Sequence, residues 1–447
     1  MCSHAPPQSI LLPGAKKKRG EGIPRIKAGE TGRPKAHSKF GPLNLYELFE
    51  QAAAKYGPLP CMGKRRVGSD GKLGEFEYIN YDSVLTQLRT VGSGLRSLGL
   101  SPGSTVGIWA SNRIEWMLSS LGAFSQAITN VPLYDTLGEE AIIYEINHAE
   151  LTLIVLEKAK LNVLAPLLGR CPTLKTVVQI EPLAGAVPPA EFEKANVAVT
   201  DWANLTASGL ASPMPPTLPS PESNAFIMYT SGTTGNPKGV LYEHRSTVLH
   251  ALAAIQPPAF NFNASSVMLP VVPMFHAASW GLPYAGAMAG IKFVFSAVND
   301  PAVLDEVMKT EGVTDSAGVP TVWLAHFQYC DANGLDLPKL KAATIGGSAA
   351  PRFMIERLMK NGTRVQHAWG MTETSPIGTV GGPTGNWDEL TFDEQVEKTM
   401  KQGRPIFGVE LRTVDLDDRT KVLPRDGEAS GALQIRGPWV VKRYFKA

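Results

Sequence analysis

The chain has few of the features that mark membrane-spanning or secreted proteins. Its 447 residues include only four cysteines, which are scattered and show no metal-ligand spacing: Cys2, Cys61, Cys171 and Cys330. A reducing interior compartment suits such sparse thiols, and we expect a cytoplasmic protein. No uninterrupted apolar run approaches the length needed to cross a bilayer, and no secretory signal is recognisable. Charged residues make up only 19% of the chain, which predicts a soluble globular protein.

The net charge of +2 is also small, but it is unevenly distributed. Residues 1–40 carry nine Lys and Arg against two Glu, which gives this segment about +7 and leaves the rest near −5. The segment is rich in Pro and Gly, so we expect a disordered basic leader. Its Lys16–Arg19 cluster suits a solvated tail, with peripheral contact to an acidic membrane or an organelle address as alternatives. Nucleic-acid binding is not expected, because no aromatic residue is interleaved with these charges before Phe40.

Strands alternate with helices along most of the remaining chain. This spacing is typical of βαβ units and predicts a mostly parallel sheet. The expected helices include 43–56, 82–98 (capped by Asp82), 112–125, 138–148, 243–254, 285–289, 301–312 and 351–359. The expected strands include 78–81, 105–110, 127–131, 151–156, 225–229, 267–273, 292–295, 342–346, 364–368, 408–414 and 431–436.

A run rich in glycine and hydroxyl groups, YTSGTTGNPKG, is the most informative segment and covers Tyr229–Gly239. Its backbone amides can form an anion-binding nest, while the hydroxyls and Lys238 add donors and a positive charge. A strand is expected before it and a helix after it, which is the layout of a phosphate site. The Walker A pattern fails, because Pro237 stands where that motif needs its second glycine. A flexible Ser/Thr/Gly linker is the alternative, which the preceding apolar strand disfavours.

This run resembles, almost letter for letter, the phosphate-loop signature of the adenylate-forming (AMP-binding) superfamily. That superfamily includes acyl-CoA synthetases, luciferases and peptide-synthetase adenylation domains. The resemblance implies an α/β fold with two mostly parallel sheets flanked by helices, in αβαβα layers, plus a small distorted β-barrel subdomain. It also implies that the loop holds the phosphates of ATP through Thr230, Ser231, Gly232, Thr233, Thr234, Gly235 and Lys238.

A second segment, Gly346–Pro351, follows an expected strand and opens an expected helix. Its small residues leave a flat slot that a planar ring could fill. In the family this segment lines the adenine pocket, which implies cofactor-binding roles for Gly347, Ser348, Ala349, Ala350 and Pro351. A tight turn between strand and helix explains the segment equally well when it is taken alone.

A third segment, HAWGMTET at His367–Thr374, is similar to the family's aromatic–Gly–apolar–Thr–Glu signature. By resemblance, Trp369 stacks on adenine, Thr372 binds the α-phosphate and Glu373 holds Mg²⁺. The rest of this cofactor-binding segment is His367, Ala368, Gly370 and Met371. The chemistry agrees, because attack of a carboxylate on a phosphate needs a divalent cation and fixed donors to neutralise charge. Taken alone, Glu373 could equally be a solvated loop acid.

A fourth segment, PMFHAASWGLPY at Pro273–Tyr284, places a histidine between two apolar stretches. Such a histidine is more often a core residue, but the family has one beside the carboxylate of the acyl substrate. The resemblance therefore assigns His276 to the catalytic site. Trp280 falls where bacterial long-chain acyl-CoA synthetases have a tryptophan that gates the acyl tunnel, with plain core packing as the alternative.

The resemblance covers about residues 42–445 and points to two branches of the family. Val131–Gly138 and Leu45–Phe49 are similar to eukaryotic long-chain acyl-CoA synthetases. The segments from the phosphate loop onward are closer to bacterial medium- and long-chain ligases. Both branches activate fatty acids, so the sequence leaves the acyl chain length open.

The chain stops at Ala447, before the family's mobile small domain. We therefore expect a leader over residues 1–40, a large AMP-binding domain over 41–405 and a β subdomain over 406–447, in a truncated or lid-less chain. The small domain supplies a lysine that stabilises the adenylation transition state. Without it, we expect slow adenylation and poorer transfer to CoA.

The predicted function is a fatty acid–CoA ligase that uses ATP, Mg²⁺ and CoA. A fatty acid carboxylate attacks the α-phosphorus of ATP, giving acyl-AMP and pyrophosphate, and the CoA thiolate then displaces AMP. The predicted catalytic set is Thr230, Lys238, His276 and Glu373, with Thr230 and Glu373 at the metal. Two rivals stay open: a ligase for short-chain or aryl acids, and a catalytically weak ATP- or acyl-binding remnant. A homodimer is compatible with the sequence but is not required by it.

Overall fold

In the computed structural model the chain divides into two units, Met1–Leu43 and Asn44–Ala447. The structure describes residues 9–11, 25–27, 43–67, 73–134, 138–183, 189–230, 235–296 and 298–447. In the first unit, β1 (Ser9–Leu11) pairs antiparallel with β2 (Arg25–Lys27). The rest of the predicted disordered leader lies outside the described residues, so that expectation stays a prediction.

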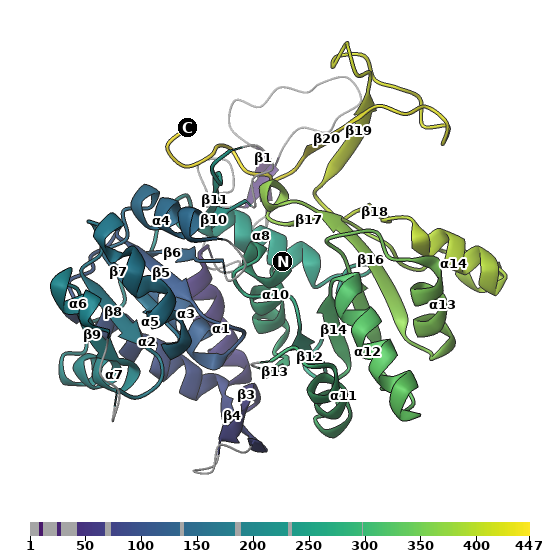
Figure 1. Ribbon diagram of the computed structural model, residues 1–447. Helices are drawn as coiled ribbons and strands as arrows, with labels where there is room; N and C mark the ends of the chain where they lie inside the picture. Colours follow the sequence, from purple (N-terminus) through teal and green to yellow (C-terminus); the bar gives the residue numbers. More distant parts are fainter. Residues whose placement is uncertain are drawn as a thin grey trace, which may run out of the picture. The chain divides into compact units, whose positions relative to one another are not determined.

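Two sheets organise the second unit (Figure 1). The first sheet has seven strands in the order β11-β10-β6-β5-β7-β8-β9, and every neighbouring pair is parallel except β10–β11. Its central strands are short and buried on both faces, as expected for parallel strands covered by helices. The strands are β5 (Thr105–Trp109), β6 (Thr129–Pro132), β7 (Leu153–Leu156), β8 (Thr176–Gln179), β9 (Ala198–Asp201), β10 (Asn224–Tyr229) and β11 (Gly239–Glu243).

The second sheet has nine strands in the order β18-β17-β16-β15-β14-β12-β13-β3-β4. Its centre is parallel, whereas β3–β4 at one edge and β16–β17–β18 at the other pair antiparallel. The strands are β3 (Pro60–Val67), β4 (Leu73–Asn80), β12 (Val267–Pro270), β13 (Lys292–Phe295), β14 (Asp315–Gly318), β15 (Ala342–Ile345), β16 (Arg364–Gly370), β17 (Ile377–Val380) and β18 (Arg404–Pro405).

Helices fill the space between the sheets and cover their outer faces. The largest apolar core includes side chains of α1 (Leu45–Tyr56), α2 (Tyr81–Ser97), α3 (Ile114–Phe124), α8 (His244–Ala254) and α10 (Leu282–Ala289), with residues of both sheets. A second core joins the other face of the first sheet to α4 (Glu139–His148), α5 (Lys158–Leu164) and α6 (Ala190–Lys194). A third core joins the second sheet to α11 (Pro301–Thr310), α12 (Pro320–Asn333), α13 (Arg352–Lys360) and α14 (Phe392–Met400). The predicted αβαβα layering is confirmed.

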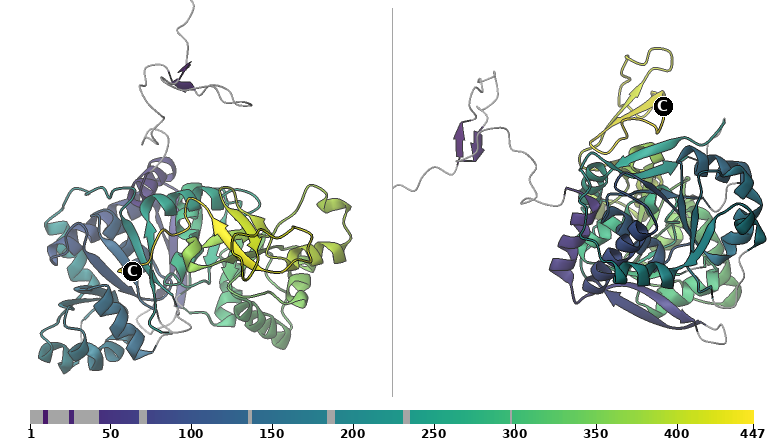
Figure 2. Two further views of the ribbon diagram at one scale, coloured as in Figure 1. Left: turned by 90° about the horizontal axis from the view of Figure 1, so that it is seen from above. Right: turned by 90° about the vertical axis from the view of Figure 1, so that its left-hand side faces the viewer.

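The remaining elements lie at the edges of the second unit. Helix α7 (Trp202–Ala211) packs on α2. Strands β19 (Glu410–Val414) and β20 (Ala432–Arg436) form a separate two-stranded antiparallel sheet, the yellow hairpin of Figures 1 and 2. The small β subdomain expected from the sequence is thus a hairpin sheet. None of the helices in the described part of the chain combines the length and the apolar character needed to span a bilayer.

Side-chain caps fix the start of the first two helices, and one of them corrects the sequence analysis. The Asn44 side chain accepts a hydrogen bond from the Glu47 backbone N–H at 2.9 Å, which begins α1. The predicted cap of α2 at Asp82 is wrong. The cap is Asn80, whose side chain accepts from the Ser83 N–H at 2.8 Å, so Tyr81 is already helical.

Candidate active site

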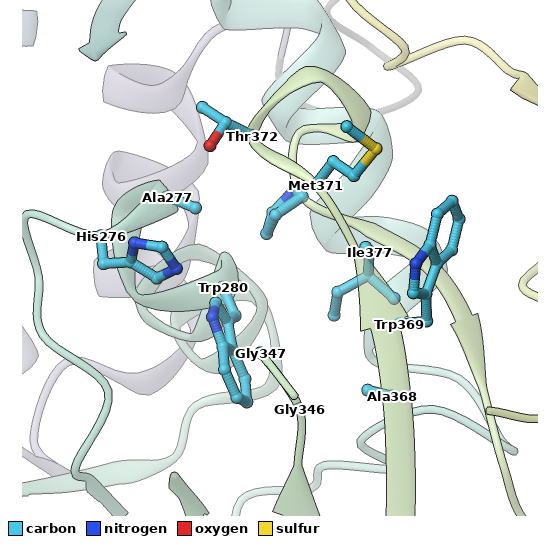
Figure 3. Close-up of a pocket in the computed structure, with 12 residues that line it drawn as sticks. His276, Ala277, Trp280, Gly346, Gly347, Ala368, Trp369, Met371, Thr372 and Ile377 are labelled. Carbon is cyan, nitrogen blue, oxygen red and sulfur yellow. The ribbon is translucent and has the colours of Figure 1, made fainter. Parts of the chain in front are cut away.

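A cavity of about 200 Å³ lies where β15 and β16 end, beside the loop that follows β12 (Figure 3). It is bounded by the loop that carries His276, by the turn after β15 and by the segment after β16. The lining residues are His276, Ala277, Trp280, Gly346, Gly347, Ala368, Trp369, Gly370, Met371, Thr372, Pro376 and Ile377. The fold therefore brings together three of the four segments singled out from the sequence. Ligand sites of α/β sheets commonly lie outside the carboxyl ends of parallel strands, as this one does.

The loop that presents His276 is held from behind by a buried asparagine. The Asn112 amide nitrogen donates to the carbonyl oxygens of Pro270 and Val272 at 2.8 and 2.9 Å, and its side-chain oxygen accepts from the Met274 N–H at 2.7 Å. These three bonds satisfy backbone groups at the point where β12 ends and the loop begins. Asn112 therefore fixes where the loop leaves the sheet, and with it the position of His276.

Directly after His276 the backbone makes a left-handed turn, α9 (Ala277–Trp280). The φ angles of Ala277, Ala278, Ser279 and Trp280 are +46°, +51°, +50° and +56°. Each non-glycine residue in this region costs about 1–2 kcal/mol, so the surrounding structure must impose the turn. The Ser279 hydroxyl anchors it by donating to the Val272 carbonyl at 2.9 Å. The strained turn directly follows His276 and includes Trp280, and both side chains border the cavity.

The imidazole of His276 is oriented by a tyrosine from the first sheet. Its Nδ1 lies 3.1 Å from the Tyr134 hydroxyl. Burial lowers the pKa of His276 below its ordinary value, so the ring is neutral near pH 7. A neutral ring can accept a hydrogen bond at one nitrogen and donate one at the other. With Nδ1 engaged by Tyr134, Nε2 is left to face a ligand.

Trp280 closes the floor of the cavity. Its side chain is 6% exposed and lies against the two glycines after β15. A Cβ added at Gly346 would come within 3.2 Å of Trp280 Cη2. Gly347 has a φ of +79°, and a Cβ there would lie 3.0 Å from Val319 Cγ1. The two glycines therefore let the backbone turn tightly beneath the indole.

The phosphate-loop segment lies in a β-hairpin, which corrects the predicted strand–loop–helix layout. Strand β11 follows the loop directly and pairs antiparallel with β10, and α8 begins only at His244. The hairpin is closed by the Thr230 N–H, which donates to the Lys238 carbonyl at 3.0 Å, and by the Lys238 N–H, which donates to Thr230 Oγ1 at 3.2 Å. Ser231, Gly232, Thr233 and Thr234 lie outside the described residues, so their predicted phosphate contacts stay predictions. Gly235 follows them with a φ of +115°.

Glu373 and Lys238 are joined through a tyrosine that the sequence analysis did not single out. The Tyr444 hydroxyl donates to Glu373 Oε1 at 2.9 Å, and Lys238 Nζ lies 5.2 Å from the centre of the Tyr444 ring. The Glu373 carbonyl also accepts from the Val441 N–H at 2.9 Å. Next to it, the Thr372 carbonyl accepts a hydrogen bond from Tyr242 of β11 at 2.8 Å. The hairpin and the segment after β16 are thus held at a fixed separation.

Other residues predicted to bind the cofactor are placed beside the cavity but do not line it. These are Ser348, Ala349, Ala350, Pro351 and His367. His367 is 1% exposed; its Nδ1–H donates to the Thr399 carbonyl at 3.2 Å, and its Nε2 accepts from the Ala350 N–H at 3.3 Å. Both ring nitrogens are therefore used in fixing the turn after β15. A cofactor-binding role for these residues stays a prediction.

Trp369 borders the cavity, but its indole is directed to the side of β16 away from Trp280 (Figure 3). There it packs against β17, so that a Cβ at Gly378 would lie 2.8 Å from Trp369 Cζ3. Gly370 follows, and a Cβ at this position would lie 1.8 Å from the Pro376 carbonyl oxygen, so only glycine fits. Stacking of Trp369 on an adenine ring stays a prediction, and it requires the ring to reach that side of the strand.

Comparison with known proteins decides the family. The profile described as "AMP-binding enzyme" matches residues 49–445. The chain belongs to the AMP-binding enzyme family. This confirms the resemblance drawn from the phosphate loop and the segments after it.

Relatives in this family include CoA ligases with different named substrates. A medium-chain-fatty-acid–CoA ligase of Ectopseudomonas oleovorans is 36% identical over 408 residues, which are 90% of this chain and 72% of that protein. A long-chain-fatty-acid–CoA ligase of Thermus thermophilus is 34% identical and is matched over 90% of this chain and 70% of its own length. A 3-methylmercaptopropionyl-CoA ligase of Ruegeria lacuscaerulensis is also 34% identical, over 91% of this chain and 73% of that protein.

Solved structures confirm the fold. A long-chain-fatty-acid–CoA ligase from Archaeoglobus fulgidus superposes with a TM-score of 0.75 at 24% identity, covering 91% of this chain and 77% of that one. The N-terminal domain of FACL13 from Mycobacterium tuberculosis gives a TM-score of 0.72 at 20% identity, covering 90% and 91%.

Proposed function

We propose that this chain is a fatty acid–CoA ligase that forms an acyl-adenylate from a fatty acid and ATP. The observation that carries the proposal is a cavity beside a pair of charged groups, linked through Thr372, which lines the cavity, and its neighbour Glu373. A neutral histidine, His276, borders a partly open cavity, and a lysine and a carboxylate, Lys238 and Glu373, both contact Tyr444 beside the hairpin that closes the phosphate-loop segment. A carboxylic acid at the first and a polyphosphate at the second would bring the reacting atoms together.

In the first step, a carboxylate oxygen of the acid attacks the α-phosphorus of ATP and pyrophosphate leaves with the bonding electron pair. His276 would donate from Nε2 to the acid's other oxygen and hold it in line, while Tyr134 keeps the ring in place. Lys238 and the amides of the hairpin would neutralise charge on the departing phosphates. In the second step, the CoA thiolate attacks the acyl carbon and AMP leaves.

Magnesium is the expected companion of ATP in this reaction. Mg²⁺ prefers a carboxylate together with phosphate oxygens, and Glu373 presents a carboxylate that accepts from Tyr444, whose ring in turn contacts Lys238, so the residues fit the ion. Glu373 would hold it, with the Thr230 hydroxyl as a further oxygen donor. When bound, the ion supplies charge neutralisation at the phosphates.

The length of the acid depends on Trp280. The cavity of about 200 Å³ is smaller than the roughly 300–1,000 Å³ of usual ligand pockets, and the indole of Trp280 forms its floor. A medium or long acyl chain would need this indole to turn aside, which is the predicted gate. A second candidate, a short-chain acid, fits with the indole left in place, and the similarity to a 3-methylmercaptopropionyl-CoA ligase favours keeping it in the test.

The experiment is acid-dependent pyrophosphate release by the chain, with saturated acids from C4 to C18 and with ATP and Mg²⁺. Release should depend on the acid and should fall by about 10²–10³ in Lys238→Ala and Glu373→Gln, because each removes a charge at the phosphates. Glu410→Gln is the matched control, since Glu410 lies on β19 and pairs with the exposed Arg436. Release that peaks at C4 would replace the fatty acid by the short-chain alternative. If no acid gives release while ATP still binds by calorimetry, the ligase proposal is wrong for this chain.

A further inference from the structure

Three side chains of kinds that can bind a metal ion meet between α11 and α12, on the outer face of the second sheet (Figure 1). Asp305 comes from α11, and His326 and Cys330 come from α12. They are 4%, 1% and 0% exposed. The cavity of the candidate active site contains none of them, so the proposed ligase function does not account for this cluster.

The three potential ligand atoms face one another. His326 Nε2 lies 3.0 Å from Asp305 Oδ1, and Cys330 Sγ lies 3.5 Å from each of these two atoms. The spacing of four residues between His326 and Cys330 places both on the same face of α12, opposite α11. The four cysteines showed no metal-ligand spacing when considered by themselves, because the partner of Cys330 is a histidine one helical turn earlier.

These separations match the edge lengths of a tetrahedral zinc site. Zinc bonds of about 2.3 Å to sulfur and about 2.0–2.2 Å to nitrogen and oxygen require ligand atoms about 3.3–3.6 Å apart. The observed 3.0 and 3.5 Å are within a few tenths of an ångström of that range, so small side-chain rotations suffice. A thiolate, an imidazole and a carboxylate are also a donor set that suits zinc, whereas Mg²⁺ prefers oxygen alone.

We propose that Asp305, His326 and Cys330 form a zinc-binding site that staples α11 to α12. On binding, the Cys330 thiol releases its proton to solvent, and the ring hydrogen of His326 resides on Nδ1 while Nε2 donates its lone pair to the metal. The Lys309 ammonium donates to Asp305 Oδ2 at 2.7 Å and so directs Oδ1 toward the other two ligands. Three protein ligands leave the fourth corner for water. The side chain of Lys309 is 38% exposed, which places the cluster one side chain away from solvent.

The position of this site connects it mechanically to the cavity wall. Strand β14 runs between α11 and α12 in the sequence, and Val319 connects that strand to α12. Val319 lies directly behind Gly347, which lines the cavity. A metal that holds α12 against α11 would therefore stiffen the support of this wall.

The first test uses the whole chain and the metal alone. Purified protein is dialysed against a chelator, then against buffer with Zn²⁺ or Co²⁺, and metal content is measured by mass spectrometry and absorption spectroscopy. One equivalent of zinc is expected, and the Co²⁺ form should show the near-ultraviolet band of a thiolate–cobalt bond and the visible bands of tetrahedral Co²⁺. Zinc should also raise the thermal unfolding midpoint. The proposal is wrong if the chain retains no metal, shows no sulfur band and unfolds at the same temperature with and without zinc. The three side chains would then form only a hydrogen-bonded cluster.

Matched variants locate the sulfur. Cys330→Ser should lose the band and the zinc-dependent shift in midpoint, whereas Cys171→Ser, which alters another buried thiol, should keep both. Glu373→Gln should also keep both, which separates this site from the predicted magnesium site. A band that persists in Cys330→Ser would overturn the assignment. The spectrum of the unaltered chain decides the question even if a variant fails to fold.

Discussion

A buried carboxyl on α4 should make this protein less stable as the pH rises. Glu145 is 0% exposed, and neither of its carboxyl oxygens has a hydrogen-bond partner among the described residues. Burial raises the pKa of Glu145 to about 8, although the backbone of Tyr134 favours the ionised form and offsets part of that shift. The perturbation that tests this is Glu145→Gln, which keeps the shape of the side chain and removes its titration.

The size of the effect follows from the difference between the folded and unfolded pKa values. Below pH 4.5 the carboxyl is protonated in both the folded and the unfolded state, so this group adds no pH dependence to the free energy of unfolding. Between pH 4.5 and about 8 the unfolded chain releases its proton while the folded chain retains it, so stability falls as the pH rises. At about 1.4 kcal/mol per pKa unit, the loss at pH 8 is on the order of 4 kcal/mol. That is a large fraction of the roughly 5–15 kcal/mol by which proteins are stable.

The assay is urea unfolding of the unaltered chain and of Glu145→Gln at several values between pH 5 and 9. Burial lowers the pKa of His244 and His250 to about 3, and unfolding returns it to about 6.5, so these groups also change the stability in the acidic part of this range. The difference between the two proteins is therefore the informative quantity. The variant should gain stability relative to the unaltered chain as the pH rises, and the gain should level off above pH 8. Glu140→Gln, an exposed position on the same helix whose partner is Arg170, should lack this gain, because its folded pKa is lowered instead.

Parallel curves for the unaltered chain and Glu145→Gln would refute the reasoning. They would mean that Glu145 ionises at the same pH in both states, and hence that its carboxylate is solvated or paired in the folded protein. A constant offset between the curves would not matter, because it reflects only the cost of burying an amide in place of a carboxyl group.

Three further predictions concern the candidate active site. Tyr444→Phe should weaken binding of Mg·ATP up to about tenfold in calorimetry, because it removes the hydroxyl bonded to Glu373 and keeps the ring beside Lys238. Unchanged binding would show that this contact does not contribute to ATP binding. Asn112→Ala should lower the free energy of unfolding in urea by about 2–4 kcal/mol and slow acyl-adenylate formation, because three buried hydrogen bonds to the loop after β12 are lost. Normal stability and rate would contradict the role of Asn112 in holding this loop. Trp280→Ala should shift pyrophosphate release toward longer acids, since it removes the cavity floor; an unchanged acid profile would show that the indole does not limit length.

The sequence predicted the segments with strong apolar periodicity well, and it missed several other elements, among them helices α12 and α14 and strand β11. The alternation from Tyr81 to Leu156 has short loops and strong apolar periodicity, so its helices and strands were expected within a few residues. Strand β11 was not expected, because its residues gain their ladder only by pairing back onto β10 across the phosphate loop. Strand β3 was also missed, because Lys64, Arg65 and Arg66 interrupt its apolar pattern, although it pairs with β4, the next strand along the chain.

Site residues that belong to a sequence motif could be predicted. Residues that reach the site only through contacts between distant segments could not. His276, Thr372 and Glu373 were found from their segments, and Figure 3 places the first two around one cavity. Tyr134, Tyr242 and Tyr444 were not singled out for the site, although each donates to or contacts a site residue. A lone tyrosine has no spacing signature, and its role appears only when remote strands meet.

The pairing of β3 with β13 has a consequence for synthesis of the chain. Met62 pairs with Phe293, so the hairpin β3–β4 leaves the ribosome well before the strand that it must join. At about 5–20 residues per second, a bacterial or eukaryotic ribosome needs roughly 10–45 s to make the intervening residues. During that interval the edge of β3 that will join β13 has no partner, and unpaired strand edges can pair wrongly with other chains. Slow translation or crowded polysomes should therefore lower the yield of folded protein, even though neither changes the equilibrium stability of the finished chain.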